Sequence, residues 1–289
     1  MKPIKKLLLL FLITIFIFSY CSSKKISDNQ TENLGSDTSM QAKVQIKAFW
    51  ESYRKAQKYR IDGNWTEAGL AYEQALKINP EHEDSWFNLG NMYLELNQGE
   101  KAEECWQNIV GRNPNSARAH MQLGRLYLSY ERTATFDLGK AQYEFEAAAN
   151  INKVITGPLM QLGYVALIKN EYALAYDYFQ DVTGTDTKST EPHFLLGYLA
   201  WKNSDIIKMQ DHVAKAYALA SANKVIQTDL SEGDTKDGKS HVRPINQSIF
   251  YEYSKGLEDI NELKLQVEIS SHYQKLDSNL VVIRKLIGA

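Results

Sequence analysis

The chain of 289 residues is 44% hydrophobic and 24% charged, with a formal net charge of −2. These values are typical of a globular protein with a sizeable core, and they exclude a disordered chain. Because the charge is nearly balanced and no long run of Lys or Arg occurs, we expect no nucleic-acid partner.

The N-terminus differs from the rest of the chain. Several lysines precede an apolar run over residues 7–18, which is the order of a secretory signal peptide. The run is shorter than the roughly 18 apolar residues that a membrane-spanning helix needs. Cys21 follows in a setting that resembles the cleavage and acylation site of bacterial lipoproteins, although Tyr20 stands where a small residue is usual. We therefore expect a signal peptide over residues 1–20 and a lipid on Cys21, with a plain secretory signal and an uncleaved anchor as alternatives.

A polar segment and one further cysteine follow the signal peptide. Residues 21–40 are rich in Ser, Asn, Asp and Thr and lack apolar periodicity, which predicts a flexible tether. Once Cys21 is acylated, Cys105 is the only cysteine left, so no intramolecular disulfide can form. Cys105 lies within a helical pattern, where we expect a small buried side chain rather than a reactive thiol.

Residues 41–221 repeat one pattern about five times. Small residues that we call the anchors recur at intervals of 34, 34, 39 and 34 residues: Ala56, Gly90, Gly124, Gly163 and Gly197. Tyrosine or alanine stands three residues after each anchor. A bulkier apolar residue stands sixteen residues after four of them, namely Tyr72, Trp106, Phe179 and Val213. The third unit rejoins the pattern at Ala141 and Phe145 after an insertion ahead of Leu138.

This pattern resembles the tetratricopeptide repeat family. The second unit carries the family's signature positions most fully, at Trp86, Leu89, Gly90, Tyr93, Ala102, Trp106 and Pro114. The resemblance implies an all-α, right-handed superhelical solenoid of helix-turn-helix units. The units are expected over residues 49–82, 83–116, 117–155, 156–189 and 190–221.

Helix packing explains these residue types. Apolar positions at three- and four-residue spacing give each unit two amphipathic helices, and a small anchor lets a neighbouring helix approach closely. Pro80 and Pro114 are expected to end the second helix of the first two units. Since one unit cannot bury its own apolar face, neighbouring units must stack.

The last part of the chain departs from the repeat. Residues 222–245 are polar and predict a loop, whereas residues 246–289 resume an apolar helical spacing and predict a C-terminal cap. The alternation of Leu263, Leu265, Val267 and Ile269 would equally suit a strand.

The family resemblance also implies a ligand site. In this family the ligand usually lies in a concave groove lined by the first helix of each unit. Transferred to this chain, the groove comprises Tyr53, Phe87, Asn91, Met121, Arg125, Met160, Tyr164, Phe194, Tyr198 and Trp201, with Gln57, Arg60, Leu94, Leu128 and Leu167 in the same rows. Such an apolar, aromatic groove suits a helix or an extended peptide. Alternatively, residues 246–289 fill it from within, because large exposed apolar patches are uncommon on monomers.

Other sites find little support. A carboxylate clamp of the kind found in some family members lacks two residues, because Tyr53 and Gln57 replace its Lys and Asn. His120 and His193 occupy equivalent repeat positions, which indicates packing. The acidic residues between Asp229 and Asp237 lack the spacing of a calcium loop. We therefore expect no metal, no cofactor and no enzymatic activity.

The sequence thus predicts a scaffold or adaptor in the bacterial cell envelope. It would be anchored to a membrane by lipid, facing either the periplasm or the cell surface, and would bind a protein or peptide in the groove. The alternative is a structural or surface-exposed lipoprotein whose groove is filled by its own C-terminal segment. Self-association into a homo-oligomer is compatible with both interpretations.

Overall fold

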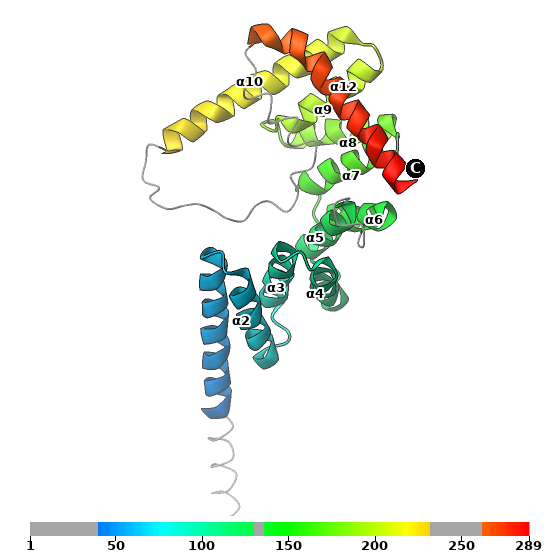
Figure 1. The fold of residues 1–289 in the computed structure, drawn as a ribbon. Helices are drawn as coiled ribbons and strands as arrows, with labels where there is room; N and C mark the ends of the chain where they lie inside the picture. The colour runs from blue at the N-terminus through cyan, green and yellow to red at the C-terminus, as the bar shows by residue number, and fades with distance from the viewer. Residues whose placement is uncertain (1–39, 130–135, 232–261, 289) are drawn as a thin grey trace, which may run out of the picture.

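The computed structural model describes residues 40–129, 136–231 and 262–288, and all regular elements within these ranges are α-helices (Figure 1). The predicted signal peptide, the tether up to residue 39, Cys21 and most of the predicted loop lie outside the described residues. None of the described helices is long and apolar enough to cross a membrane.

Five antiparallel helix pairs follow one another along the chain, and a single helix ends it. The pairs are residues 40–61 with α2 (Trp65–Ile78), α3 (Glu83–Glu95) with α4 (Gly99–Arg112), α5 (Ala117–Leu128) with α6 (Leu138–Ile151), α7 (Gly157–Ile168) with α8 (Tyr172–Thr185), and α9 (Glu191–Lys202) with α10 (Ile206–Ser231). We call these pairs units 1 to 5. The last helix, α12 (Glu262–Ile287), runs back from α9 towards α7 (Figure 1).

In units 1, 2, 4 and 5 the turn between the two helices has the same backbone conformation. Seven residues after the anchor, the backbone adopts a positive φ, at Gly63 (75°), Asn97 (57°), Asn170 (64°) and Ser204 (58°). Glycine and asparagine tolerate this left-handed conformation better than other residues do. One such residue reverses the chain between the two helices, so the repeat is encoded in the turns as well as in the core.

The anchors lie where the two helices of a unit approach most closely. A Cβ atom added to Gly90 would come within 2.6 Å of Nε1 of Trp106, and one added to Gly124 within 2.5 Å of Cε1 of Phe145. Both aromatic side chains are fully buried. Each belongs to the second helix of the same unit, which confirms the close approach that the sequence predicts for these two anchors.

The core continues from unit to unit. One buried cluster joins units 1 and 2 around Tyr72 and Leu89, and a second joins units 2 to 4 around Trp106 and Phe145. A third joins units 4 and 5 to α12. The last cluster is therefore completed by a helix that lies outside the repeats.

Two boundaries differ from the sequence prediction, and one alternative that it left open is wrong. The first helix begins at residue 40, ahead of the first predicted unit. Helix α10 continues through Ser231, so residues 222–231 are helical and not part of a loop. Residues 263–269 lie in α12, so the alternative of a strand is wrong, because burial of an i, i+4 stripe wins over a short local alternation.

Candidate functional site

Helix α12 covers the predicted groove in units 4 and 5. The ring centroid of Tyr273 lies 5.1 Å from that of Phe194, 5.8 Å from that of Tyr198 and 6.1 Å from that of Trp201. Met160, Tyr164 and Leu167 of unit 4 belong to the same buried cluster, together with Leu276, Leu280 and Ile283 of α12. Five of the ten predicted groove residues, Met160, Tyr164, Phe194, Tyr198 and Trp201, therefore face the chain's own helix or the core beneath it.

Tyr273 supplies what unit 5 lacks. The other units carry an aromatic residue on the second helix against or near the anchor, but unit 5 has Val213 there. The hydroxyl of Tyr273 reaches Gly197 and donates a hydrogen bond to the carbonyl of Phe194 at 2.9 Å. In unit 2, Nε1 of Trp106 donates to the carbonyl of the equivalent Phe87 at 3.3 Å. A residue of α12 thus takes the place of the repeat's missing aromatic side chain.

Polar contacts fix the position of α12. The carboxylate of Asp277 accepts hydrogen bonds from the hydroxyl of Tyr198 and from Nζ of Lys202, both at 2.8 Å. Burial alone would raise the pKa of Asp277, but the hydrogen bonds from Lys202 and Tyr198 and the positive charges of Lys202 and Arg284 outweigh it and lower the pKa. The negative form of Asp277 is therefore the one that holds α12 in place.

Arg284 ties the other end of α12 to unit 4. Its Nε donates to the carbonyl of Ile168 at 2.8 Å and its Nη2 to that of Leu167 at 2.6 Å. These carbonyls belong to the last turn of α7, and that of Leu167 also accepts from the backbone N–H of Asn170 at 3.2 Å. The guanidinium also lies over the ring of Tyr172, 6.0 Å from its centroid. A positive charge at the C-terminus of α7 is favourable to its helix dipole.

The predicted groove residues of units 1 to 3 have a different environment. Tyr53 lies half-buried among aromatic rings, 6.0 Å from Phe49, 5.8 Å from Tyr72 and 5.1 Å from His82 between centroids. The guanidinium of Arg118 lies 4.7 Å from the ring centroid of Phe87 and pairs with Asp84. We call the face formed by Tyr53, Phe87, Asn91, Met121 and Arg125 the open face. Each of these side chains is half-buried, and among the residues that the structure describes, the helix outside the repeats, α12, packs on α7 and α9 instead.

The open face has a polar and cationic side. The side-chain amide of Gln122 donates to Oδ1 of Asn91 at 3.0 Å, which links units 2 and 3. Arg125 stands where units 4 and 5 carry Tyr164 and Tyr198. Burial lowers the pKa of Arg125, yet a guanidinium stays charged at neutral pH. The open face therefore offers apolar contact area beside a fixed positive charge.

The two singled-out histidines serve packing. Nε2 of His120 lies 3.0 Å from the carbonyl of Pro114, as Nε1 of the equivalent Trp86 lies 2.7 Å from that of Pro80. Nδ1 of His120 lies 2.6 Å from Glu144 of α6. His193 faces His212 of α10 at 3.4 Å. Within the described part of the chain, no three His, Cys, Asp or Glu side chains gather as a metal site would require.

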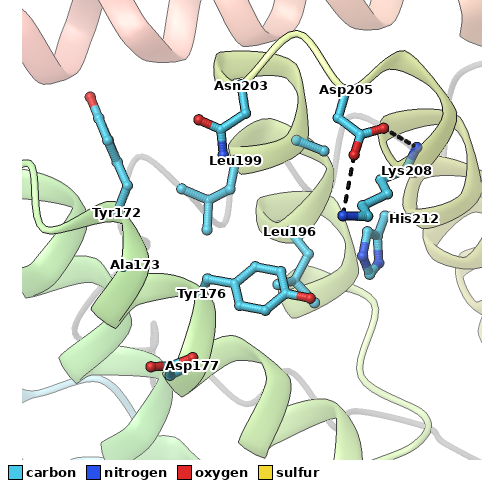
Figure 2. A pocket seen from close by; sticks show the side chains of 11 residues that line it. Tyr172, Ala173, Tyr176, Asp177, Leu196, Leu199, Asn203, Asp205, Lys208 and His212 are labelled. Atoms are coloured by element: carbon cyan, nitrogen blue, oxygen red, sulfur yellow. Dashed lines mark hydrogen bonds and ion pairs between the residues drawn. The ribbon is translucent and has the colours of Figure 1, made fainter.

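A cavity of about 380 Å³ lies between α8, α9 and α10, away from the predicted groove. Figure 2 shows its apolar floor at Leu196 and Leu199 and its polar rim at Asn203, Asp205 and His212. The rim is engaged in local contacts, because Asp205 accepts a hydrogen bond from the backbone N–H of Lys208 at 3.1 Å and pairs with its Nζ at 3.3 Å. Sequence reasoning gave no sign of this cavity.

The sequence also missed the contact residues of α12. Tyr273, Asp277 and Arg284 have no counterpart in the repeat pattern, so periodicity could not single them out. One signal was present: Val213 is smaller than the residues at the equivalent position of other units, which marks unit 5 as incomplete.

Comparison with known proteins supports the repeat assignment. The tetratricopeptide repeat model matches residues 59–126. Anaphase-promoting complex subunit 3 of Schizosaccharomyces pombe is 23% identical over 146 residues, which are 48% of this chain and 21% of that protein. The tetratricopeptide repeat and J domain-containing co-chaperone DNJ1 of Fusarium oxysporum is 32% identical over 89 residues, 31% of this chain and 16% of that protein. The chain thus spans about a fifth or less of the length of these relatives.

Solved structures show the same fold. A crystal structure of MamA superposes with a TM-score of 0.53 at 19% identity and covers 58% of this chain and 96% of that chain. MamA from Desulfovibrio magneticus RS-1 gives a TM-score of 0.54 at 15% identity, over 61% of this chain and 96% of that chain. Proteins of this fold are generally scaffolds that bind other proteins, and no catalytic family is indicated. The chain is an all-α solenoid of tetratricopeptide-type helical repeats.

Proposed function

We propose that this protein is an adaptor that binds a protein or peptide partner on its open face. The proposal narrows the predicted groove from five units to units 1 to 3. The residues that would contact the partner are Tyr53, Phe87, Asn91, Met121 and Arg125. Tyrosine and arginine are enriched at binding hot spots, and phenylalanine and methionine are enriched at interfaces in general.

The observation that carries this proposal is the docking of α12 on units 4 and 5. There the first helices accept an amphipathic helix through aromatic contacts with Tyr273 and a carboxylate contact with Asp277. Equivalent rows of residues continue into units 1 to 3. A partner helix is therefore expected to bind the open face with the same chemistry that α12 uses within the chain.

Electrostatics specify the partner further. Asp277 of α12 meets a lysine and a tyrosine hydroxyl in unit 5. In unit 3 the fixed cation is Arg125, which sits one turn along the helix from Met121. An apolar helix or peptide with an acidic residue near its apolar stripe fits this face, because the half-buried Arg125 keeps its positive charge at neutral pH.

The same proposal places the protein in a bacterial cell envelope, held to a membrane by lipid on Cys21. The basic, apolar and cysteine-containing order of the N-terminus supports it. Mass spectrometry of the mature N-terminus tests it: a diacylglyceryl-modified Cys21 is the expected result. An unmodified cysteine, or a mature chain that begins elsewhere, would remove the lipid anchor from the proposal.

Partner capture from envelope extract tests the binding surface. We compare the wild type with Phe87→Ala/Arg125→Gln, which removes a ring and a charge from the open face. The matched control is Tyr143→Ala/Tyr176→Ala, which removes two exposed rings from second helices. Loss of a specific partner by at least about tenfold in the first variant alone is expected for hot-spot residues. Equal capture by all three proteins would show that the open face is not the binding surface.

The second candidate is a structural role, in which the chain's own helix fills the groove. The contacts of α12 with units 4 and 5 favour this role for that part of the molecule. If the chain also fills units 1 to 3 from within, the protein would act mainly through its outer surface. In that case neither double substitution would change capture.

A further inference from the structure

We infer that the first helix, residues 40–61, carries a surface for anionic lipid on its solvent side. The helix holds six Lys or Arg residues and one acidic residue, Glu51, although the whole chain has a net charge of −2. Five of the six, Lys43, Lys47, Arg54, Lys55 and Lys58, are exposed. We call the exposed side of this helix the basic face.

Large apolar side chains share the basic face. Met40 is 64% exposed, Val44 61%, Trp50 44% and Ile61 68%. At 100° per residue, they lie on the same side of the helix as Lys43, Lys47, Arg54 and Lys58. The opposite side is used by the fold, since Phe49 and Ala56 are buried there against the remainder of unit 1. The helix therefore has apolar residues on both sides, whereas five of its six cations lie on the exposed side and only Arg60 turns towards the fold.

The helix also projects from the solenoid. It is longer than α2, its partner in unit 1, and Figure 1 shows its N-terminal part extending past the end of α2. Residues 40–47 are exposed throughout. A helix over residues 40–61 is roughly 33 Å long at about 1.5 Å per residue. Because residues 40–47 are exposed, packing within the solenoid does not explain why cations and large apolar side chains alternate there.

Charge and apolarity together specify the partner. Five cations of this helix face solvent, and they favour binding to a negatively charged surface. Glu51 is the one acidic side chain on the helix, and it pairs with Lys47 at 3.8 Å. The apolar side chains project from a convex cylinder between the lysines, so they suit the fluid boundary between headgroups and acyl chains. Trp50 suits this boundary as well, because its ring makes edge contacts with Phe49, Tyr53 and His82 and still remains exposed.

Docking of the basic face orients the molecule. Each Lys or Arg near an anionic membrane surface adds to the electrostatic attraction between the protein and the membrane. This attraction falls off within about one Debye length of the surface, and added salt weakens it because it shortens that length. The helix would lie along the membrane with units 2 to 5 leading away from it. This contact stands on the helix alone and does not depend on a partner of the open face or on a lipid at Cys21.

Depth-dependent quenching of Trp50 tests the inference. The full chain is mixed with vesicles whose lipids carry brominated acyl chains. One set of vesicles is neutral and contains phosphatidylcholine alone, and the other is anionic and contains phosphatidylcholine with phosphatidylglycerol. The chain has five tryptophans, so the contribution of Trp50 is the difference between the wild type and Trp50→Phe. We expect this contribution to be quenched on anionic vesicles and to be recovered at high salt.

Charge variants separate the basic face from overall charge. Lys43→Gln/Lys47→Gln/Arg54→Gln/Lys58→Gln should lower the ratio of docked to undocked protein on anionic vesicles by at least about tenfold. The control Lys77→Gln/Lys101→Gln/Lys140→Gln/Lys153→Gln removes the same charge from other exposed positions and should leave the ratio unchanged. Three results would overturn the inference. They are equal quenching of Trp50 on both vesicle types, no quenching on either type, and a fluorescence response of Trp50 to an acidic peptide but not to anionic vesicles.

Discussion

Individual residues set how closely the helices of this solenoid pack. Gly124 is the clearest case, because a single added methyl group would meet the buried ring of Phe145 at 2.5 Å. Phe145 is completely enclosed and cannot swing into solvent. The anchors are thus positions where size, more than polarity, decides stability.

Substitution of Gly124 by alanine measures this constraint. We expect Gly124→Ala to lower the free energy of unfolding by about 1–3 kcal/mol through overpacking. Gly111→Ala is the control, since nothing lies within 4 Å of its added Cβ atom, and alanine in a helix should stabilise it by about 0.5–1 kcal/mol. Urea unfolding followed by circular dichroism gives both values. A stabilising effect at both positions would contradict the packing described for the anchors.

Cys105 illustrates burial without reactivity. Burial, and to a smaller extent the charges of Glu104 and Glu73, raise the pKa of its thiol to about 12. Since the thiolate is the nucleophile, we expect no alkylation of Cys105 by iodoacetamide at pH 8 in the folded protein, and rapid alkylation in urea. Peptide mass spectrometry distinguishes the two states. Fast labelling of the folded protein would show that unit 2 opens on the experimental timescale.

At the scale of the helical element, α12 is held by charge as well as by apolar contacts. The pKa of Asp277 is lowered in the folded state, so its contribution to stability is present above the ordinary aspartate pKa of about 3.9 and is lost as the pH falls through its lower folded value. The contacts that bind α12 should therefore weaken in acid.

The variant Asp277→Asn isolates this contribution. At pH 7 we expect its free energy of unfolding to be about 1.5–3 kcal/mol lower than that of the wild type, the usual range for hydrogen bonds to a charged group. The difference should shrink as the pH falls below about 4, because the wild type then also loses the negative charge. Urea titrations of both proteins at a series of pH values provide the measurement. A difference that grows in acid would contradict the role assigned to Asp277.

Helix α12 also shows what a repeat pattern can and cannot reveal. The spacing of Ala56, Gly90, Gly124, Gly163 and Gly197 identifies five units and the face of each first helix, because these depend on local periodicity. The position of α12 depends on contacts such as Tyr273 with Phe194, which are far apart in sequence. Helical composition and spacing predicted a cap over residues 246–289, of which the structure describes 262–288, and left the filled groove as one of two alternatives. No local rule could decide how far along the groove the cap extends.

At the scale of the whole molecule, the solenoid has two parts, which differ in whether α12 packs on the first helix of each unit. Units 4 and 5 are packed against α12, and units 1 to 3 present the open face. Unit 1 adds the basic face on its solvent side. If the proposed adaptor function and the inferred lipid contact hold, the surface for a membrane and the surface for a peptide lie on different parts of one chain.

Photo-crosslinking from two equivalent faces tests this division most directly. A benzophenone side chain replaces Phe87 on the open face in one protein and Trp201 under α12 in another, and both are irradiated in envelope extract. We expect position 201 to cross-link within the chain, to the peptide that contains Tyr273, and position 87 to cross-link to a different protein. A cross-link from position 201 to another protein, with none to α12, would contradict the account.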